Sequence, residues 1–445
     1  MTQSSRGLLA AIEFPPAGGG GVIRVVKTVR YLHDSGWDMT VIARDDPNPA
    51  VRDDSLLGEL PASTRIVRVR APFSGATAAA TSGAKGRLAR GSRFRSVLIA
   101  ARSVFRSLTG IPDRWNLWAM RAGRLPLSSL GQASVIVSSG PPHSVHLASA
   151  RLARRLAIPL VMDIRDEWAI NPLYRSRLPW KAWIDRRLER RIVNDAAAIV
   201  LVSEVSRSRY AAAYPRLTQR MTVIPNGFDP ADLAGIDTTR RVPPPGRPIL
   251  FGYAGSLHNR RDGRPFLKAF GEMARAAGDQ RPLALLMVGM FDEQQEAAAR
   301  ALVAAVSLTV MSFVEHRRAL ELMAACDALV VLTNEEEAGS AALTGKIFEY
   351  LALRRPILAV SPAGACQQLV LETSAGAWAE SRDVPGIRSA IRQVVSQVLD
   401  AGWTGAPTDL LRRYDREEQA REWAELLNRV TGLVASTPAR RDAVR

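Results

Sequence analysis

Cysteine is nearly missing from this chain, and long apolar runs are missing altogether. Only Cys326 and Cys366 occur among 445 residues, each with apolar neighbours. A disulfide scaffold is therefore excluded, and a reducing, cytoplasmic compartment is expected. The longest apolar run, Ala196–Val202, falls far short of the roughly 20 residues that cross a bilayer. The run Gly7–Ile12, soon followed by Pro and Gly, does not resemble a signal peptide. The sequence therefore does not predict an integral membrane protein.

Acidic residues are the scarcer charged class. There are 60 Lys and Arg against 43 Asp and Glu, a formal net charge of +17. Such a balance attracts anions, whether nucleic acid, lipid headgroups or phosphorylated small molecules. Hydrophobic residues make up 47% of the chain and charged residues 23%, which is ordinary for a globular protein. The length suits two α/β domains of about 200 residues each.

Short β-branched runs alternate with longer helical stretches, a pattern typical of parallel sheets built from βαβ units. We expect a first domain over residues 1–237, a Pro- and Arg-rich linker over 238–248 and a second domain over 249–413. A C-terminal helix over 414–432 and a disordered tail over 433–445 complete the chain. The expected strands are Leu8–Ile12, Met39–Ala43, Arg65–Val69, Val135–Ser138, Leu160–Asp163, Ile199–Val202, Met221–Ile224, Ile249–Tyr253, Ala284–Val288, Leu308–Met311, Ala328–Leu332 and Ile357–Val360.

An insertion over 72–112 breaks this alternation. Its segment Lys85–Arg106 holds seven basic residues, no acidic ones and several large apolar side chains. One interpretation is a solvated insertion helix. The other is an amphipathic helix that binds a membrane surface or an acceptor, with Arg90, Arg93, Arg95 and Arg102 as its contacts. Nothing resembling a nucleic-acid-binding module accompanies the charge, so nucleic acid is not an expected partner.

Three loops of the first half follow predicted strands. Phe14–Gly21 is Gly-rich and precedes a helix, so its backbone N–H groups can approach an anion; a simple flexible turn is the alternative. Residues 138–146 (SSGPPHSVH) precede the next helix, where His143 could be catalytic, a helix cap or a surface residue. Asp163–Trp168 (DIRDEW) ends the following strand, where α/β sheets place ligands. Asp163 and Asp166 could instead form structural salt bridges to Arg165 or Arg151.

The second half contains two matching features. Gly255 and Ser256 end its first strand, and Arg260, Arg261 and Arg264 follow in one loop. Later, Thr344 and Gly345 open a helix on which Lys346 and Glu349 share a face. A lysine in the first turn adds to the positive end of the helix dipole, which costs stability. Its placement is understandable if an anion such as a pyrophosphate binds there. The alternative, a structural Lys346–Glu349 surface pair, would contribute under about 1 kcal/mol.

Together these residues resemble the retaining family-4 glycosyltransferases, which have the two-domain GT-B fold. The resemblance covers nearly the whole chain and is closest to members that build bacterial surface polysaccharides. Its most specific stretches are Phe14–Gly21, residues 138–144, Asp163–Trp168, Asp195–Ser203, Val223–Asp229 (VIPNGFD), Gly252–Arg264, Phe313–Asp327 and Gly345–Pro356 (GKIFEYLALRRP).

The resemblance implies a GT-B fold, with two Rossmann-like domains facing each other across a deep cleft. It also implies transfer of a sugar from a nucleotide-diphosphate donor to an acceptor, with retention of configuration. In it Glu349 would bind the ribose, Lys346 and Arg261 the pyrophosphate, and Phe313–Glu315 would border the base. The donor-site candidates are Gly255, Ser256, Arg260, Arg261, Phe313, Glu315, Thr344, Gly345, Lys346 and Glu349. The catalytic candidates are Gly20, Gly21, His143 and Asp166, and Arg165 is expected on the acceptor side.

The sequence departs from the family pattern at three positions. Ala341 replaces the first of two glutamates spaced eight apart, Ser256 replaces a common arginine, and Arg165 replaces a histidine before Asp166. No D-x-D pair occurs, so we expect no metal at the diphosphate and no cofactor. Cations and helix dipoles would stabilise the leaving group instead.

The expected partners are a nucleotide sugar, a lipid-linked or small-molecule acceptor and an anionic membrane surface. The expected location is the cytoplasm, at the inner face of the plasma membrane. The alternatives are a GT-B sugar-nucleotide epimerase or hydrolase, an inactive donor-binding subunit and, least favoured, a nucleic-acid-binding protein.

Overall fold

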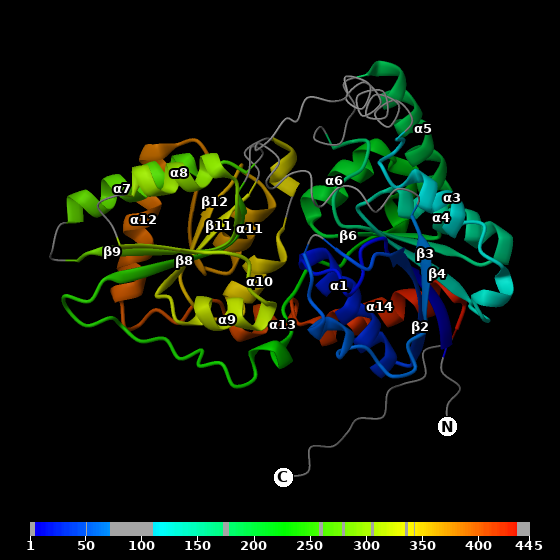
Figure 1. Cartoon of the computed structure of the whole chain (residues 1–445), viewed down its shortest axis with the longest axis horizontal. Helices are drawn as coiled ribbons and strands as arrows, with labels where there is room; N and C mark the ends of the chain where they lie inside the picture. The colour runs from blue at the N-terminus through cyan, green and yellow to red at the C-terminus, as the bar shows by residue number, and fades with distance from the viewer. Residues whose placement is uncertain are drawn as a thin grey trace, which may run out of the picture. The chain divides into compact units, whose positions relative to one another are not determined.

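The computed structural model describes residues 5–49, 51–71, 110–171, 178–257, 261–277, 281–303, 307–333, 337–341 and 343–433. The chain divides into two compact units (Figure 1). Unit 1 comprises Met1–Val202, Arg207–Ile224 and Ala420–Arg445, and unit 2 comprises Ser203–Ser206 and Pro225–Gln419. The basic segment Lys85–Arg106, Arg260 and the tail beyond residue 433 lie outside the described residues. No helix among the residues that are described is long and apolar enough to span a membrane.

Unit 1 contains a seven-stranded parallel sheet in the order β3-β2-β1-β4-β5-β6-β7. The strands are β1 (Ser5–Ala10), β2 (Trp37–Asp45), β3 (Ile66–Arg70), β4 (Val135–Gly140), β5 (Leu160–Ile164), β6 (Ala198–Leu201) and β7 (Met221–Val223). The helices are α1 (Gly20–Asp34), α3 (Asn116–Ala122), α4 (Ser144–Leu156), α5 (Pro179–Asp195), α6 (Glu204–Ala213) and α14 (Arg416–Thr431), with single turns η1 (Ser55–Leu57), η2 (Leu127–Ser129) and η3 (Pro215–Arg220).

Helices cover both faces of this sheet, because its central strands carry apolar residues on both sides. Side chains of α3, α4, α5 and α6 form one core with Leu8 and Ile136, and those of α1 and α14 form the other with Leu9 and Val137. The placement of α14 was not predicted from the sequence. Trp423 and Leu427 near the end of the chain are buried beside α1, so residues from Ala420 onward complete unit 1.

Unit 2 contains a six-stranded parallel sheet in the order β10-β9-β8-β11-β12-β13. Its strands are β8 (Ile249–Leu257), β9 (Leu283–Phe291), β10 (Ser307–Met311), β11 (Ala328–Leu332), β12 (Ile357–Val360) and β13 (Gly376–Ala379). Its helices are α7 (Arg264–Ala277), α8 (Glu293–Leu302), α9 (His316–Ala324), α10 (Gly345–Ala352), α11 (Ala365–Glu372), α12 (Val384–Leu399) and α13 (Thr408–Arg412), with turns η4 (Pro230–Leu233) and η5 (Glu337–Ala341).

Each sheet is a doubly wound sheet of the Rossmann type, with helices on both faces. The strand order reverses between β1 and β4 in unit 1 and between β8 and β11 in unit 2. Loops at the carboxyl ends of the strands beside such a reversal are where ligands of α/β sheets bind. The prediction of two Rossmann-like α/β domains is confirmed.

Candidate functional site

The loop after β1 leads into a helix start that no side chain caps. Gly19 is the N-cap of α1 with φ 112°, a backbone conformation that favours glycine. No side chain caps α1, and its first turn contains no acidic residue. A Cβ built on Gly19 or Gly20 would meet nothing within 4 Å. The first N–H groups of α1 can therefore donate hydrogen bonds to an anionic or polar ligand.

Arg165 connects this helix start to the loop after β4. Its guanidinium lies so close to Gly21 that a Cβ there would overlap Arg165 Nη1. Arg165 Nε donates to Gly140 O at 3.2 Å, and Nη2 donates to Pro141 O. The structure thus brings together three loops that were predicted separately, those after β1, β4 and β5.

Asp163, at the end of β5, is buried and paired with Arg24 of α1. Arg24 Nη2 donates to Asp163 Oδ1 at 2.8 Å and Nε donates to Oδ2 at 3.2 Å, while Ser139 Oγ donates to Oδ2 at 2.7 Å. Burial alone would raise the pKa of Asp163, but Arg24, Arg165 and Ser139 together lower it below its ordinary value. The sequence-based alternative named Arg165 or Arg151 as the salt-bridge partner. For Asp163 the structure shows an ion pair with Arg24, which lies 139 positions away in the sequence, and Arg165 acts on the same carboxylate electrostatically.

His143 is buried, so a surface role for it is excluded. Its ring stacks on Trp168 with centroids 5.3 Å apart and planes 6° apart. It occupies the N-cap position of α4 without a side-chain capping bond, so the capping alternative is wrong as well. Burial, with help from His146 and Arg165, lowers the pKa of His143 well below its ordinary value. The imidazole is therefore neutral at physiological pH, and a catalytic role for it stays a prediction.

Two buried carboxyl groups on α5 hold Trp168 in place, and the sequence did not single them out. Trp168 Nε1 donates to Asp185 Oδ1 at 3.0 Å, and Trp168 N donates to Tyr210 OH at 3.1 Å. Tyr210 OH in turn donates to Glu189 Oε1 at 2.7 Å. Burial raises the pKa of Asp185 to about 6 and that of Glu189 to about 7. The one sequence feature that could have indicated them is their spacing of four residues, which places both side chains on the same face of α5. Asp166, beside this network, is partly buried.

In unit 2 the start of α10 is likewise open. Thr344 is its N-cap but makes no side-chain capping bond, and no acidic residue lies in the first turn. A Cβ on Gly345 would meet nothing within 4 Å. The positive end of the α10 dipole is thus available to an anion.

Two cations lie beside this helix start. Burial and the nearby Arg261 lower the pKa of Lys346 to about 8, against the opposing effect of Glu349. Arg261 contacts the Tyr253 hydroxyl, whose pKa burial raises to about 12. Among the described residues, the buried Nε of Arg261 has no hydrogen-bond partner. Two cations held close together in partial burial favour an anionic ligand between them.

Glu349 lies one turn along α10 from Lys346 and is bonded to a residue that the sequence did not predict. His316 Nε2 lies 2.9 Å from Glu349 Oε1. Burial would raise the pKa of Glu349, but His316, Lys346 and Arg416 lower it overall. Glu349 is therefore ionised, as hydrogen bonding to ribose hydroxyls requires.

The other predicted donor residues that the structure describes lie at the end of β8 and just before α9. Ser256, at the end of β8, is partly exposed, and its carbonyl accepts from Tyr253 OH at 3.1 Å. Gly255 faces Gly289 of β9, where only a glycine fits, since a Cβ on Gly289 would overlap Gly255 O. Phe313 is 42% exposed. Glu315 is the exposed N-cap residue of α9.

Two family models match the chain. The "Glycosyl transferase 4-like domain" model matches residues 19–227, and the "Glycosyl transferases group 1" model matches residues 248–397. Each matched range contains one of the two helix starts described above. No curated protein matches the chain in a sequence search.

Solved structures similar to the chain include a glycosyltransferase from Rickettsia africae, with TM-score 0.59, 11% identity and coverage of 96% of this chain and 98% of that one. The lipopolysaccharide outer core galactosyltransferase WaaB is similar with TM-score 0.55, 12% identity and coverage of 95% and 99%. UDP-GlcNAc 2-epimerase from Neisseria meningitidis is similar with TM-score 0.51, 11% identity and coverage of 95% and 100%. Likenesses at such low identity show a common fold.

Proposed function

Because the chain is a glycosyltransferase with the GT-B fold, we propose that it transfers a sugar from a nucleotide-diphosphate donor to a lipid-linked acceptor, with retention of configuration. The proposed setting is the synthesis of a cell-surface polysaccharide at the cytoplasmic face of the membrane. The observation that carries the proposal is the start of α10, where Lys346, Arg261 and uncapped N–H groups converge. These are the groups that a pyrophosphate requires.

The donor would bind unit 2 through three kinds of contact. Lys346, Arg261 and the first N–H groups of α10 would hold the pyrophosphate, each charge-assisted hydrogen bond contributing about 1.5–3 kcal/mol. Ionised Glu349 would accept from the ribose hydroxyls. Phe313, whose ring is 42% exposed, offers an apolar surface to the base.

In the reaction the bond between the sugar C1 and the diphosphate oxygen breaks, and its electron pair leaves with the nucleoside diphosphate. The acceptor hydroxyl attacks C1 on the face that the leaving group vacates and gives its proton to a departing phosphate oxygen. Lys346, Arg261 and the α10 dipole stabilise the negative charge that develops on the leaving group. Since these groups are cationic or dipolar, no metal ion is needed for this step.

In unit 1 the open start of α1 and Arg165 would contact the reacting sugar and the acceptor. Arg165, which replaces the family's histidine, offers a fixed charge at the end of β5, and its Nε and Nη2 are already oriented by Gly140 O and Pro141 O. A cation held there suits an acceptor that carries phosphate.

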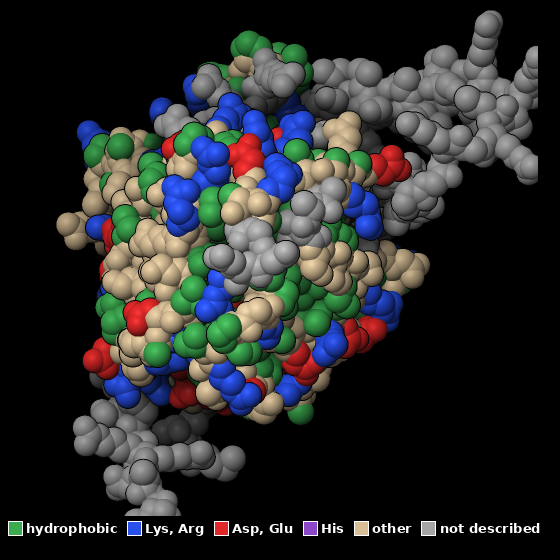
Figure 2. Space-filling model, turned by 90° about the vertical axis from the view of Figure 1, so that its left-hand side faces the viewer, with side chains coloured by type: hydrophobic (Ala, Val, Ile, Leu, Met, Phe, Trp, Pro, Cys, Tyr) green, Lys and Arg blue, Asp and Glu red, His purple; other side chains and the backbone are tan. Residues whose placement is uncertain are grey.

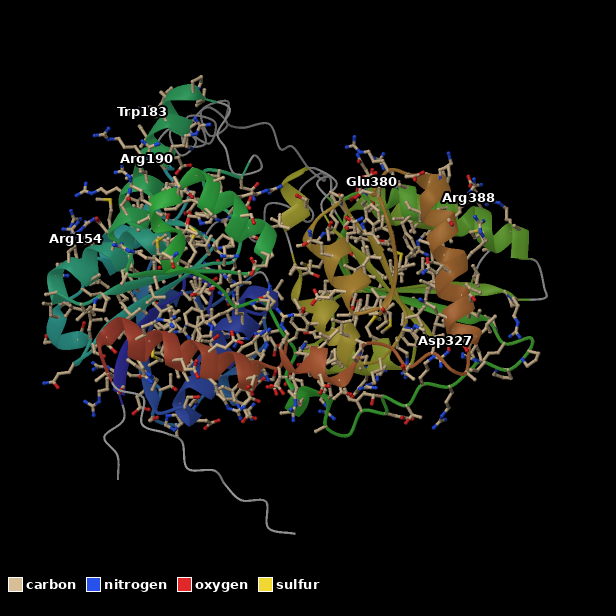
Figure 3. The ribbon with its side chains drawn as sticks, turned by 180° about the vertical axis from the view of Figure 1, so that it is seen from behind. Arg154, Trp183, Arg190, Asp327, Glu380 and Arg388 are labelled. Atoms are coloured by element: carbon tan, nitrogen blue, oxygen red, sulfur yellow. The ribbon has the colours of Figure 1, made fainter. Side chains whose placement is uncertain are left out.

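The outer face of α5 supports the membrane part of the proposal. Trp180 and Trp183 are 45% and 61% exposed, and Arg187 lies over the Trp183 ring at 5.6 Å. Figure 3 shows Trp183 and Arg190 on the outer side of this helix. Of the three acidic residues of α5, Asp185 and Glu189 are buried and Asp195 is the last residue of the helix. The exposed residues Arg186, Arg187, Arg190 and Arg191 are therefore not offset by an exposed carboxylate before Asp195.

Tryptophan and arginine side chains combined on one helix face suit the interface of an anionic membrane. By contrast, the face of unit 2 that carries α7 and α12 mixes acidic with basic side chains (Figure 2).

The test has two steps. Thermal stabilisation by a panel of nucleotide sugars would identify the donor, and transfer of the labelled sugar to a polyprenyl-phosphate-linked acceptor would show the reaction. Release of free or epimerised sugar without transfer would instead assign a hydrolase or an epimerase. Thermal stabilisation by a nucleotide sugar without turnover would assign a donor-binding subunit. The absence of a carboxylate at Ala341 would then explain the lack of activity.

A further inference from the structure

His316 opens α9 and contacts Glu349 of the candidate donor site. Its Nε2 donates to Glu349 Oε1 over 2.9 Å, and the two side chains are 17% and 16% exposed. His316 lies in the stretch Phe313–Asp327 that carries the family resemblance, but it was not among the candidate donor-site residues. The contact lies wholly within unit 2 and joins the start of α9 to the second turn of α10.

The charges around this contact come from four elements. Asp232 Oδ2, on η4, lies 3.9 Å from His316 Nδ1. Lys346 on α10 and Arg416 on α14 act on Glu349 electrostatically. Glu315 and Arg317 flank His316 in the sequence and are exposed, and Arg317 donates to Ala234 O at 3.0 Å. Glu349 thus has two cationic neighbours besides His316.

Lys346 is the neighbour that matters most, because it shares a helix face with Glu349 at a spacing of three. At that spacing a lysine and a glutamate readily pair with each other. Within the part of the chain that the structure describes, no salt bridge joins them, and the carboxylate is bonded to His316 instead. A Lys346–Glu349 pair would neutralise the cation that faces the pyrophosphate and occupy the oxygens that face the ribose.

We propose that His316 is a positioning residue for the donor nucleotide. By holding Glu349 Oε1, it keeps the carboxylate away from Lys346 and leaves Oε2 for a ribose hydroxyl and the lysine for the pyrophosphate. This inference rests on the proposed function of the α10 start as a nucleotide site. It adds a residue that acts through Glu349 and does not itself contact the reacting atoms.

The role of His316 depends on which of its nitrogens makes the contact. A glutamine at this position places its amide nitrogen close to the position of Nε2, whereas an asparagine places its amide nitrogen close to that of Nδ1. His316→Gln should therefore keep the hold on Glu349, and His316→Asn should lose it. If the imidazole had only a structural role, the Gln and Asn variants would not differ in nucleotide binding.

The experiment is a calorimetric titration of the full chain with UDP, GDP, dTDP and ADP, followed by transfer kinetics with the matching nucleotide sugar. We expect His316→Ala and His316→Asn to raise the Kd of the bound nucleotide and the donor KM roughly tenfold, with kcat changed much less. His316→Gln should stay within about threefold of wild type. In a Glu349→Gln background, His316→Ala should have no further effect on Kd. Arg318→Ala, at an exposed position on α9, is the matched control and should bind as wild type does.

The outcomes separate this inference from the function on which it rests. Failure of the wild-type chain to bind any of the four nucleotides would overturn both. Wild-type binding with equal Kd for His316→Ala, or equal losses for the Gln and Asn variants, would overturn the role of His316 alone. If His316→Ala fails to fold, the Kd values of His316→Gln and His316→Asn decide whether His316 positions Glu349.

Discussion

The guanidinium of Arg165 occupies the space that a side chain on Gly21 would need. This contact fixes the end of β5 against the first turn of α1, and only glycine permits it. In an ordinary helix, replacing glycine by alanine stabilises by up to about 1 kcal/mol. Here the added Cβ must displace Arg165 from Gly140 O and Pro141 O, so we expect alanine at position 21 to destabilise the protein.

We therefore predict that Gly21→Ala lowers the free energy of unfolding by about 1–3 kcal/mol, the usual cost of overpacking. Gly20→Ala is the matched control, because a Cβ on Gly20 meets nothing within 4 Å, and it should be neutral or slightly stabilising. Urea denaturation of the two variants measures the difference. Equal stabilities would show that Arg165 moves aside freely.

The pKa of Lys346 gives donor binding a pH dependence. Burial and Arg261 bring this pKa to about 8 in the free protein, so the side chain is charged below pH 8 and neutral above it. A pyrophosphate favours the charged form and must therefore draw in a proton above pH 8. We predict that the Kd for the nucleoside diphosphate rises as pH increases from 8 to 9, by up to about tenfold.

Lys346→Arg is the control for this prediction, because an arginine stays protonated throughout the range. Its Kd should be nearly constant between pH 7 and 9 in calorimetric titrations. A wild-type Kd that does not change over this range, or an equal slope in the arginine variant, would contradict the role of Lys346.

Leaving-group stabilisation by cations and helix dipoles predicts metal-independent transfer. Turnover should persist in EDTA, measured as release of nucleoside diphosphate after removal of divalent cations. Loss of activity on chelation that Mg²⁺ or Mn²⁺ restores would mean that a metal ion holds the diphosphate.

Membrane attachment through unit 1 predicts binding to anionic vesicles that weakens with salt, because the Debye length shortens to about 8 Å at physiological ionic strength. Two variants test two surfaces. One changes Trp180 and Trp183 of α5 to Ala, and the other changes Arg90, Arg93, Arg95 and Arg102 of the basic segment to Gln. Each should co-sediment several-fold less than wild type.

The charge-matched control for the vesicle assay changes Arg275, Arg300, Arg382 and Arg392 to Gln, at exposed positions in unit 2. It should bind vesicles as wild type does. Equal binding by all four proteins would mean that both surfaces only face solvent, and the acceptor could then be a soluble molecule.

Much of the fold was predictable because apolar runs in this chain are short and distinct. The predicted bounds of Ala328–Leu332 agree with those of β11, since every residue of β11 is buried. The strand β13 was missed, because four residues of sequence GAWA carry no alternation and no β-branched side chain.

The candidate sites were predictable only where their residues adjoin a strand end or a helix start. Gly20, Gly345 and Lys346 meet that condition. The Arg24–Asp163 pair and the His316–Glu349 contact do not, because each joins residues far apart in the sequence. The packing of Trp423 into unit 1 was hidden for the same reason. Tertiary contacts decide such pairs, and no local pattern encodes them.

The start of α10 as the donor site is the central claim, and turnover by Lys346→Ala and Glu349→Ala tests it most directly. The measurement is release of nucleoside diphosphate from the identified nucleotide sugar, alongside circular dichroism to verify folding. Each variant should lose at least about 100-fold in kcat/KM while remaining folded, since each loses charge-assisted hydrogen bonds to the nucleotide. Turnover near that of wild type in either folded variant would contradict the account.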